Sequence, residues 1–210
     1  KGGVIFRKAF CANPTCSASR AALLTGQCPH RNGMIGLAHR GFSLNDYEKH
    51  IVHTLRKAGY YSALAGVQHL IQHDRIAEIG YDKILGHAGE AHLVAGRFLR
   101  NSPKQPFFLS VGFGPTHRKY PEPDPGDNPD FCMPPAPIPD TPQTRYDTAC
   151  YRACARRLDY LMGTVLNELE QSGLADNTLV ICTTDHGIAF PYMKCNVNDH
   201  GTGVMLIMRG

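Results

Sequence analysis

The run Leu-Val-Ile-Cys-Thr-Thr at residues 179–184 is a short apolar segment that ends at a polar pair and a glycine. A run of this length and composition is typical of a buried strand. Two similar runs, at residues 60–66 and 107–113, precede it, and residues 91–100 and 144–172 carry apolar side chains at helical spacing between the runs. Apolar strands that alternate with amphipathic helices predict an α/β fold with a mixed, mostly parallel sheet flanked by helices on both faces.

Polar side chains follow closely after each of the three predicted strands. These clusters are Gln68-His69, Thr116-His117-Arg118 and Asp185-His186. In open α/β sheets, ligands bind outside the carboxyl ends of the strands, because these ends meet along one edge of the sheet. Three strands that deliver imidazoles or a carboxylate to one edge therefore predict a functional site there.

The composition indicates one globular domain over residues 1–210, with 42% hydrophobic and 19% charged residues. No apolar run approaches the roughly 18 residues that a membrane span needs. The net charge of +4 is small and the basic residues are scattered, so we do not expect nucleic-acid binding. Residues 121–142 hold nine prolines and are predicted to form a long surface loop without regular structure.

The eight cysteines fit neither a compact disulfide framework nor a zinc ribbon. Cys150 and Cys154 share one face of a predicted helix and are interpreted as small core residues. Residues 47–57 are predicted to form one helix that ends at Gly59. Five of the 11 histidines are expected at the surface: His50, His53, His73, His87 and His92. Four further residues line either an anionic substrate cleft or a solvated loop: His30, Arg31, His39 and Arg40.

The most unusual segment is PTCSASRAALLTG at residues 14–26. It places Cys16 at the start of a predicted helix, where free amide groups and the helix dipole favour negative charge. Arg20 lies one turn further along on the same side, so that a thiol or its oxidised product would face a guanidinium. Taken by themselves, these residues fit an oxyanion site and an ordinary helix start with a buried cysteine equally well.

This segment resembles the signature of the sulfatase family, Cys-x-Pro-x-Arg followed shortly by Leu-Thr-Gly. The likeness extends along almost the whole chain and is greatest to the heparan N-sulfatases. The other matching stretches are residues 32–34, 106–109, 115–118, 178–181 and 185–188. The resemblance implies a fold of the alkaline phosphatase superfamily and a cysteine oxidised to formylglycine by a formylglycine-generating enzyme. The hydrate of that aldehyde has two hydroxyls, one to attack sulfur and one to expel sulfate afterwards.

The resemblance also implies catalytic roles for four residues. Cys16 would become the nucleophile, and Arg20 would hold it and offset its charge. His69 corresponds to the histidine that bonds to the hydrate and acts as the base in the expulsion step. His117 corresponds to the histidine that contacts the sulfate and protonates the leaving group.

The same likeness implies a metal site and a sulfate contact. Asp185 and His186 correspond to the pair at which the aspartate coordinates a hard divalent cation, most often calcium, with Cys16 as formylglycine beside it. Because an imidazole is a poor ligand for calcium, approach of His186 to the hydrate or the sulfate is the alternative to ligation. Lys194 corresponds to a basic residue that binds a sulfate oxygen, and an ordinary surface lysine is the alternative.

The sequence departs from the family pattern in three ways. Ala18 stands where proline is usual, and Val67 stands where many relatives have a lysine. The corresponding sulfate contact is either lost or supplied from elsewhere, with Arg118 and Lys119 as the candidates. The paired N-terminal aspartates that complete the metal site would lie before the first residue, so residues 1–210 are expected to be part of a catalytic domain that lacks its first metal-binding strand and its C-terminal part.

We therefore expect a sulfatase that removes sulfate from a sulfated sugar by cleaving a sulfuric ester or a sulfamate. A phosphatase or phosphonate monoester hydrolase of the same superfamily is the first alternative. A catalytically incompetent fragment that binds sulfated glycans is the second. Relatives that degrade such glycans are periplasmic, extracellular or lysosomal, and the same location is expected here, although no signal peptide is visible in the sequence.

Overall fold

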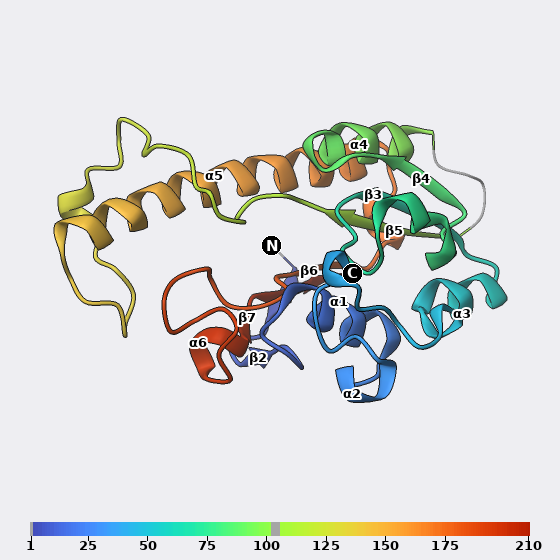
Figure 1. The fold of residues 1–210 in the computed structure, drawn as a ribbon. Helices are drawn as coiled ribbons and strands as arrows, with labels where there is room; N and C mark the ends of the chain where they lie inside the picture. Colours follow the sequence, from blue (N-terminus) through green and yellow to red (C-terminus); the bar gives the residue numbers. More distant parts are fainter. Residues whose placement is uncertain (1, 102–105) are drawn as a thin grey trace.

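The computed structural model of the chain describes residues 2–101 and 106–210 and is drawn in Figure 1. The strands are β1 (Gly3–Ile5), β2 (Ala9–Phe10), β3 (Tyr61–Gly66), β4 (Lys83–Gly86), β5 (Phe107–Gly112), β6 (Val180–Thr183), β7 (Gly203–Val204) and β8 (Leu206–Arg209). The α-helices are α1 (Cys16–Thr25), α2 (Pro29–Asn32), α3 (Ile51–Lys57), α4 (Ala91–Arg100), α5 (Pro142–Gln171) and α6 (Asp199–Thr202). Short 3-10 segments lie at Ala38–Arg40, Tyr47–Lys49, His73–Ile79, Ala88–Glu90, Pro129–Phe131 and Ala175–Asn177.

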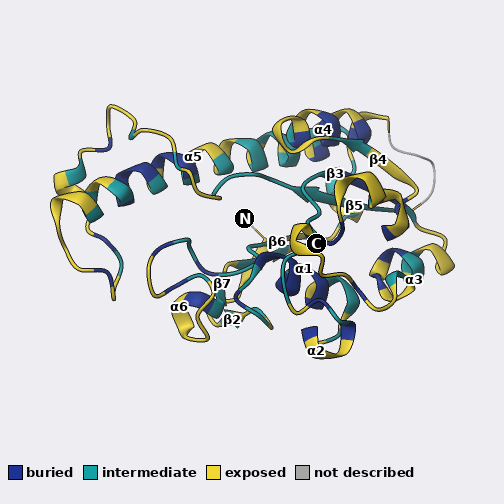
Figure 2. Cartoon of the chain, viewed as in Figure 1, coloured by how far each residue is buried: buried dark blue, intermediate teal, exposed yellow. Residues whose placement is uncertain are grey.

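A parallel three-stranded sheet of order β4-β3-β5 lies between two groups of helices. Strands β3 and β5 pair in register, with Tyr61 opposite Phe107. Side chains of β3 alternate between the two faces, because Leu64 packs with residues of α1 and α3 whereas Ala63 packs with residues of α4 and α5. Figure 1 shows α4 and α5 on one side of the sheet and α1 to α3 on the other, and in Figure 2 the outward helix surfaces are the exposed ones. The predicted α/β class with helices on both faces is confirmed.

Strand β6 belongs to a second, antiparallel sheet of order β1-β8-β6. Arg209 of β8 lies opposite Val180 of β6 on one side and opposite Gly3 of β1 on the other. Strands β2 and β7 form a further antiparallel pair. Parallel and antiparallel pairings are therefore both present, but among the described residues they lie in separate sheets, whereas a single mixed sheet was expected.

Helix α5 begins at Pro142, two residues before the predicted start. Proline suits the first turn of a helix, and the side chains of Thr141 and Thr144 form a reciprocal capping box at this end. Cys150 and Cys154 are both buried, which confirms their interpretation as core residues. No helix within the two described ranges is both long and apolar enough to cross a membrane.

The proline-rich segment 121–142 is irregular apart from one 3-10 turn and the first residue of α5. It is nevertheless attached to α5 by charge pairs. Arg156 donates from Nη1 to Asp127 Oδ1 at 2.9 Å and from Nη2 to Asp124 Oδ2 at 2.7 Å. The predicted surface loop is thus held against the helix that follows it.

The helix predicted over residues 47–57 is interrupted at His50. The backbone of His50 is extended (φ −65°, ψ 140°), and its Nδ1 accepts the N–H of Val52, so the side chain caps α3. His50 is fully buried and contacts the ring of Tyr81 edge-on, so the surface position predicted for it is wrong. Burial, with a smaller contribution from His53, lowers the pKa of His50 to about 4. Of the other four histidines expected at the surface, two are exposed (His73 and His87) and two are partly buried (His53 and His92).

Candidate active site

Helix α1 places Cys16 at its first residue, where it is 5% exposed. Thr15 precedes it with an extended backbone and makes no side-chain cap bond, so no side-chain cap competes for the first amide groups of the helix. Ala18, in the same turn, is fully buried. Because proline is itself tolerated in a first turn, the alanine found here keeps the same helical start as the proline of the family signature.

Two contacts join α1 to the end of β6. The Ser19 hydroxyl donates to the carbonyl oxygen of Asp185, and Arg20 Nε donates to Asp185 Oδ2 at 2.9 Å. Burial raises the pKa of the Asp185 carboxyl, but the charges of Arg20 and His186 outweigh burial and hold the pKa below its usual value. The carboxylate is therefore ionised and fixed beside the start of α1.

The thiol of Cys16 faces the ring of His186, with Sγ and Nε2 3.1 Å apart. The other ring nitrogen, Nδ1, lies 2.7 Å from the carbonyl oxygen of Gly187. Burial raises the pKa of the Cys16 thiol, but hydrogen bonds from His186 and His69 lower it to about 5 overall. Burial lowers the pKa of His186, and its contacts with Cys16 and Asp185 outweigh this and raise it. The pair therefore favours a thiolate beside an imidazolium.

His69 reaches the same cluster from the end of β3. Its backbone is left-handed at φ 58°, which is uncommon for a residue other than glycine. Its ring stacks on His39 at an interplanar angle of 7°, with His39 Nδ1 3.1 Å from His69 Nε2. The sequence assigned His39 and three neighbouring residues either to a substrate cleft or to a solvated loop. The structure places His39 in contact with a predicted catalytic side chain. No local pattern around residue 39 distinguishes it from its neighbours in the sequence.

The segment after β5 carries His117 and Arg118 at the surface. His117 is exposed, and its Nδ1 lies 2.5 Å from the carbonyl oxygen of Arg118. Arg118 pairs with Asp147 through Nη1 and Oδ1 at 2.9 Å, donates from Nε to the carbonyl oxygen of Ala189, and lies 4.6 Å from the centre of the Tyr120 ring. Because its guanidinium is engaged in these contacts, Arg118 is not free to bind sulfate.

Lys194 is partly buried in the segment that follows His186. The next residue, Cys195, donates its backbone N–H to the carbonyl oxygen of Pro14 at 2.9 Å, which holds this segment against the chain just before α1. Within residues 2–101 and 106–210, no recorded hydrogen bond or ion pair joins the side chain of Lys194 or that of His117 to Cys16. Contacts thus link five of the seven predicted residues, namely Cys16, Arg20, His69, Asp185 and His186, and in the described ranges no recorded bond joins the other two to Cys16.

Three of the clustered residues offer metal ligands. The sulfur of Cys16, a carboxylate oxygen of Asp185 and a ring nitrogen of His186 all lie within 4.8 Å of one another. Calcium takes about six to eight oxygen ligands, whereas this group supplies one carboxylate together with a thiol and an imidazole. As described, the donor set does not fit calcium.

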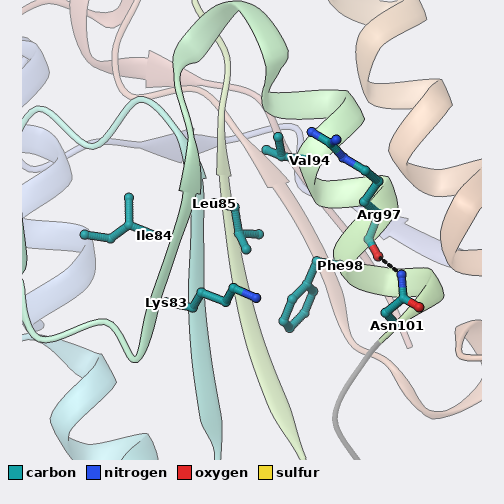
Figure 3. A pocket seen from close by; sticks show the side chains of 7 residues that line it. All are labelled: Lys83, Ile84, Leu85, Val94, Arg97, Phe98 and Asn101. Atoms are coloured by element: carbon teal, nitrogen blue, oxygen red, sulfur yellow. Dashed lines mark hydrogen bonds between the residues drawn. The ribbon is translucent and has the colours of Figure 1, made fainter.

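A pocket of about 300 Å³ lies elsewhere, between β4 and α4 (Figure 3). Its lining is Lys83, Ile84, Leu85, Val94, Arg97, Phe98 and Asn101. The side-chain amide of Asn101 donates to the backbone carbonyl oxygen of Arg97 at the end of α4. No residue of the Cys16 cluster lines this pocket. The pocket therefore lies at β4, an edge strand of the parallel sheet, and not at the predicted site.

Comparison with known proteins agrees with this geometry. The profile of the Sulfatase family matches residues 1–97 and 93–209, so the chain belongs to the sulfatase family. It is 29% identical to human N-sulphoglucosamine sulphohydrolase over 98% of this chain and 48% of that protein, and 27% identical to human N-acetylgalactosamine-6-sulfatase over 89% and 44%. The chain spans about half the length of these curated relatives.

Solved structures share the fold. BT4656, solved in complex with its substrate D-glucosamine-2-N,6-O-disulfate, superposes with a TM-score of 0.73 at 18% identity, over 99% of this chain and 64% of that one. The fold is therefore that of structurally known sulfatases, as the resemblance predicts. Sulfatases in general use a metal ion and a formylglycine residue.

Proposed function

We propose that this chain carries the catalytic residues of a sulfatase that removes sulfate from a sulfated sugar, by cleaving a sulfuric ester or a sulfamate. The observation that carries the proposal is the 3.1 Å contact between Cys16 Sγ and His186 Nε2, beside the pair Arg20–Asp185. A nucleophile, a proton carrier and a fixed positive charge meet there, as transfer of a charged sulfuryl group requires. The names of the two human relatives and the substrate of BT4656 support a sulfated amino sugar as substrate.

The proposed nucleophile is residue 16 after oxidation to formylglycine by a formylglycine-generating enzyme. Its hydrate supplies two hydroxyls on one carbon, one to attack sulfur and one to release sulfate. His186 keeps a proton on Nδ1 because that atom faces the carbonyl of Gly187, so its Nε2 can take a proton from residue 16. Arg20 holds positive charge beside the sulfuryl oxygens, and His69 approaches residue 16 from the end of β3 as the second base.

His117 and Lys194 are assigned to the substrate. His117 is exposed after β5 and would protonate the leaving oxygen or nitrogen, and Lys194 would bind a sulfate oxygen. The assignment requires the sulfate to lie between residue 16 and these two side chains. It is supported by the bond between Cys195 and Pro14, which holds the segment of Lys194 next to the start of α1.

The family profile matches both halves of the chain, which supports assigning residues 1–210 to part of one catalytic domain. A divalent cation would take Asp185 as a ligand, and calcium would need oxygen ligands beyond the described cluster. An exported or lysosomal location is proposed on the family resemblance alone.

The test is peptide mass spectrometry across residue 16 on the full-length protein from its native host, combined with hydrolysis assays. We expect the mass change from thiol to aldehyde, and release of sulfate from N- or O-sulfated glucosamine that Cys16→Ala abolishes and Cys28→Ala, at an exposed cysteine, retains. Hydrolysis of phosphate or phosphonate esters in place of sulfates would favour the phosphatase alternative. Binding of sulfated glycans without turnover would favour the non-catalytic one, and an unmodified thiol in active protein would exclude formylglycine.

A further inference from the structure

The proposed acid His117 is held by the backbone of the residue that follows it. Its Nδ1 lies 2.5 Å from the carbonyl oxygen of Arg118. Because a carbonyl oxygen can only accept a hydrogen bond, Nδ1 carries a proton, and Nε2 is the ring nitrogen that remains for the substrate. The position of the Arg118 carbonyl therefore determines the orientation of the imidazole.

The guanidinium of Arg118 joins three segments of the chain. Nη1 and Nη2 donate to the two carboxylate oxygens of Asp147 on α5, the first at 2.9 Å, and Nε donates to the carbonyl oxygen of Ala189 at 2.9 Å. A two-pronged pairing of this kind fixes direction as well as distance. Ala189 lies three residues after His186. One side chain therefore ties the loop after β5 both to α5 and to the segment after β6.

Aromatic rings from the same three segments form a cluster beside this guanidinium. The Arg118 Cζ atom lies 4.6 Å from the centre of the Tyr120 ring and 5.2 Å from that of Phe190, within the range of cation–π attraction. Tyr151 of α5 contacts both rings edge-on, at centre distances of 5.5 and 5.9 Å. The guanidinium is thus restrained by the rings as well as by its hydrogen bonds, and the backbone of residue 118 is restrained with it.

We propose that Arg118 is a positioning residue for the reaction: its guanidinium fixes the carbonyl that holds His117 Nδ1, so that Nε2 is presented to the leaving group. Sulfur bonds to the hydrate oxygen of residue 16 as its bond to the sugar oxygen or nitrogen breaks. The electron pair of the broken bond stays on the leaving atom, which takes the Nε2 proton of the imidazolium, and the neutral ring regains a proton from water. The inference rests on the sulfatase function proposed above, in which His117 is the acid.

Two substrates of the full-length protein separate positioning from folding. A sulfated sugar leaves as an alcohol or amine and needs a proton, whereas nitrophenyl sulfate leaves as a stable phenolate and does not. Arg118→Met keeps the length of the side chain but loses its charge and hydrogen bonds. We expect it to lower kcat about 10- to 100-fold on sulfated glucosamine and less than about 3-fold on nitrophenyl sulfate. Equal losses on the two substrates, or no loss on either, would overturn the proposal.

Matched variants identify the path of the effect. Adding Arg118→Met to His117→Ala should cause no further loss, because both changes remove the same proton donor. Arg118→Lys keeps the charge but not the two-pronged pairing, so it should recover only part of kcat. Arg156→Met should alter neither rate, because Arg156 pairs α5 with Asp127 and Asp124 instead. A further loss in the double variant, or a selective loss in Arg156→Met, would contradict the proposal.

The nitrogen chemical shifts of the His117 ring test the positioning without any activity. At alkaline pH the unsubstituted protein should show the Nδ1–H form, and His117→Ala identifies the signals. In Arg118→Met the Nε2–H form, which free histidine prefers, should increase. A protein that lacks the Nδ1–H form, or a form unchanged by Arg118→Met, overturns the proposal even where sulfate is released. The expected shifts in a protein that releases no sulfate would support the positioning and contradict the sulfatase function.

Discussion

The rings of His39 and His69 lie parallel, 5.4 Å apart between centres, and His39 Nδ1 is 3.1 Å from His69 Nε2. One proton is shared between these two nitrogens, so the orientation of each ring depends on the other. His69 is held in a left-handed backbone conformation at the end of β3, where its ring also reaches the Cys16 thiol. In the proposed reaction, His39 would therefore act by positioning His69.

Replacing His39 tests this relationship. His39→Ala is expected to lower kcat by about 10-fold, a fraction of what a general base contributes, and to leave KM for a small aryl sulfate unchanged. His39→Asn should recover most of kcat, because its amide places a hydrogen-bonding group near the position of Nδ1. The measurement is kcat and KM at several pH values, with His30→Ala as the control on an exposed histidine. A rise in KM at constant kcat would instead make His39 a substrate contact.

The thiol form of Cys16 should ionise at low pH. Its pKa is lowered to about 5, so the thiolate predominates at pH 7, whereas an ordinary cysteine with a pKa of about 8.5 is mostly protonated there. The ultraviolet thiolate absorbance, taken as the difference between unconverted protein and Cys16→Ser with a chelator present, should rise with a midpoint near pH 5. In His186→Ala the midpoint should move upward, because a hydrogen bond that stabilises the thiolate is lost. An unchanged midpoint would show that His186 does not cause the low pKa of Cys16.

Burial of His50 predicts an acid-sensitive stability. Its pKa is lowered from 6.5 to about 4. Between these two pH values, His50 is protonated in the unfolded chain but neutral in the folded one. The stabilisation is complete above pH 6.5 and is lost as the pH falls through about 4, amounting to at most about 3 kcal/mol. Urea unfolding at a series of pH values should show this loss. His50→Asn keeps an acceptor for the N–H of Val52 but cannot titrate, so its stability should depend less on pH in this window. An equal slope in both proteins would contradict the prediction.

Gly187 has no room for a side chain. A Cβ at this position would lie 1.8 Å from the carbonyl oxygen of His200, and the Gly187 N–H is bonded to the carbonyl of Gly201. Gly187→Ala should therefore destabilise the protein by about 1–3 kcal/mol and displace the neighbouring His186. Gly163→Ala is the matched control, because a Cβ there meets nothing within 4 Å in the middle of α5 and should raise stability by up to about 1 kcal/mol. Thermal unfolding compares the two, and an unchanged Tm for Gly187→Ala would contradict the prediction.

The parts of the fold that could be predicted from the sequence are those determined by local patterns. Strands β3, β5 and β6 and helices α4 and α5 lie within two residues of the predicted ranges, because apolar spacing is a property of each segment by itself. The rule that strand ends meet at one edge also predicted the approach of His69 and His186 to one another. Strand β6 nevertheless lies in a different sheet from β3, so the convergence on Cys16 was predicted by the family signature and not by the sheet.

Other features depend on partners that no local pattern reveals. His50 is buried because Tyr81, 31 residues further on, covers it, and a histidine between two helical segments looks like a surface residue in the sequence. Arg118 is a candidate sulfate ligand by sequence, but its guanidinium is paired with Asp147 of α5, 29 residues further on. In both cases, the environment of the side chain is determined by a contact with a residue about 30 positions away in the sequence.

The contact between Cys16 and His186 joins residues 170 positions apart. During synthesis, Cys16 therefore leaves the ribosome long before its partner exists, on the order of 10 to 30 s earlier at ordinary elongation rates. Throughout that interval Cys16 belongs to an incomplete chain that lacks His186, so the thiol would be accessible to the proposed modifying enzyme. Once the end of β6 is in place, the same residue is only 5% exposed. The order in which the chain is made thus gives Cys16 a limited period in which it can be modified.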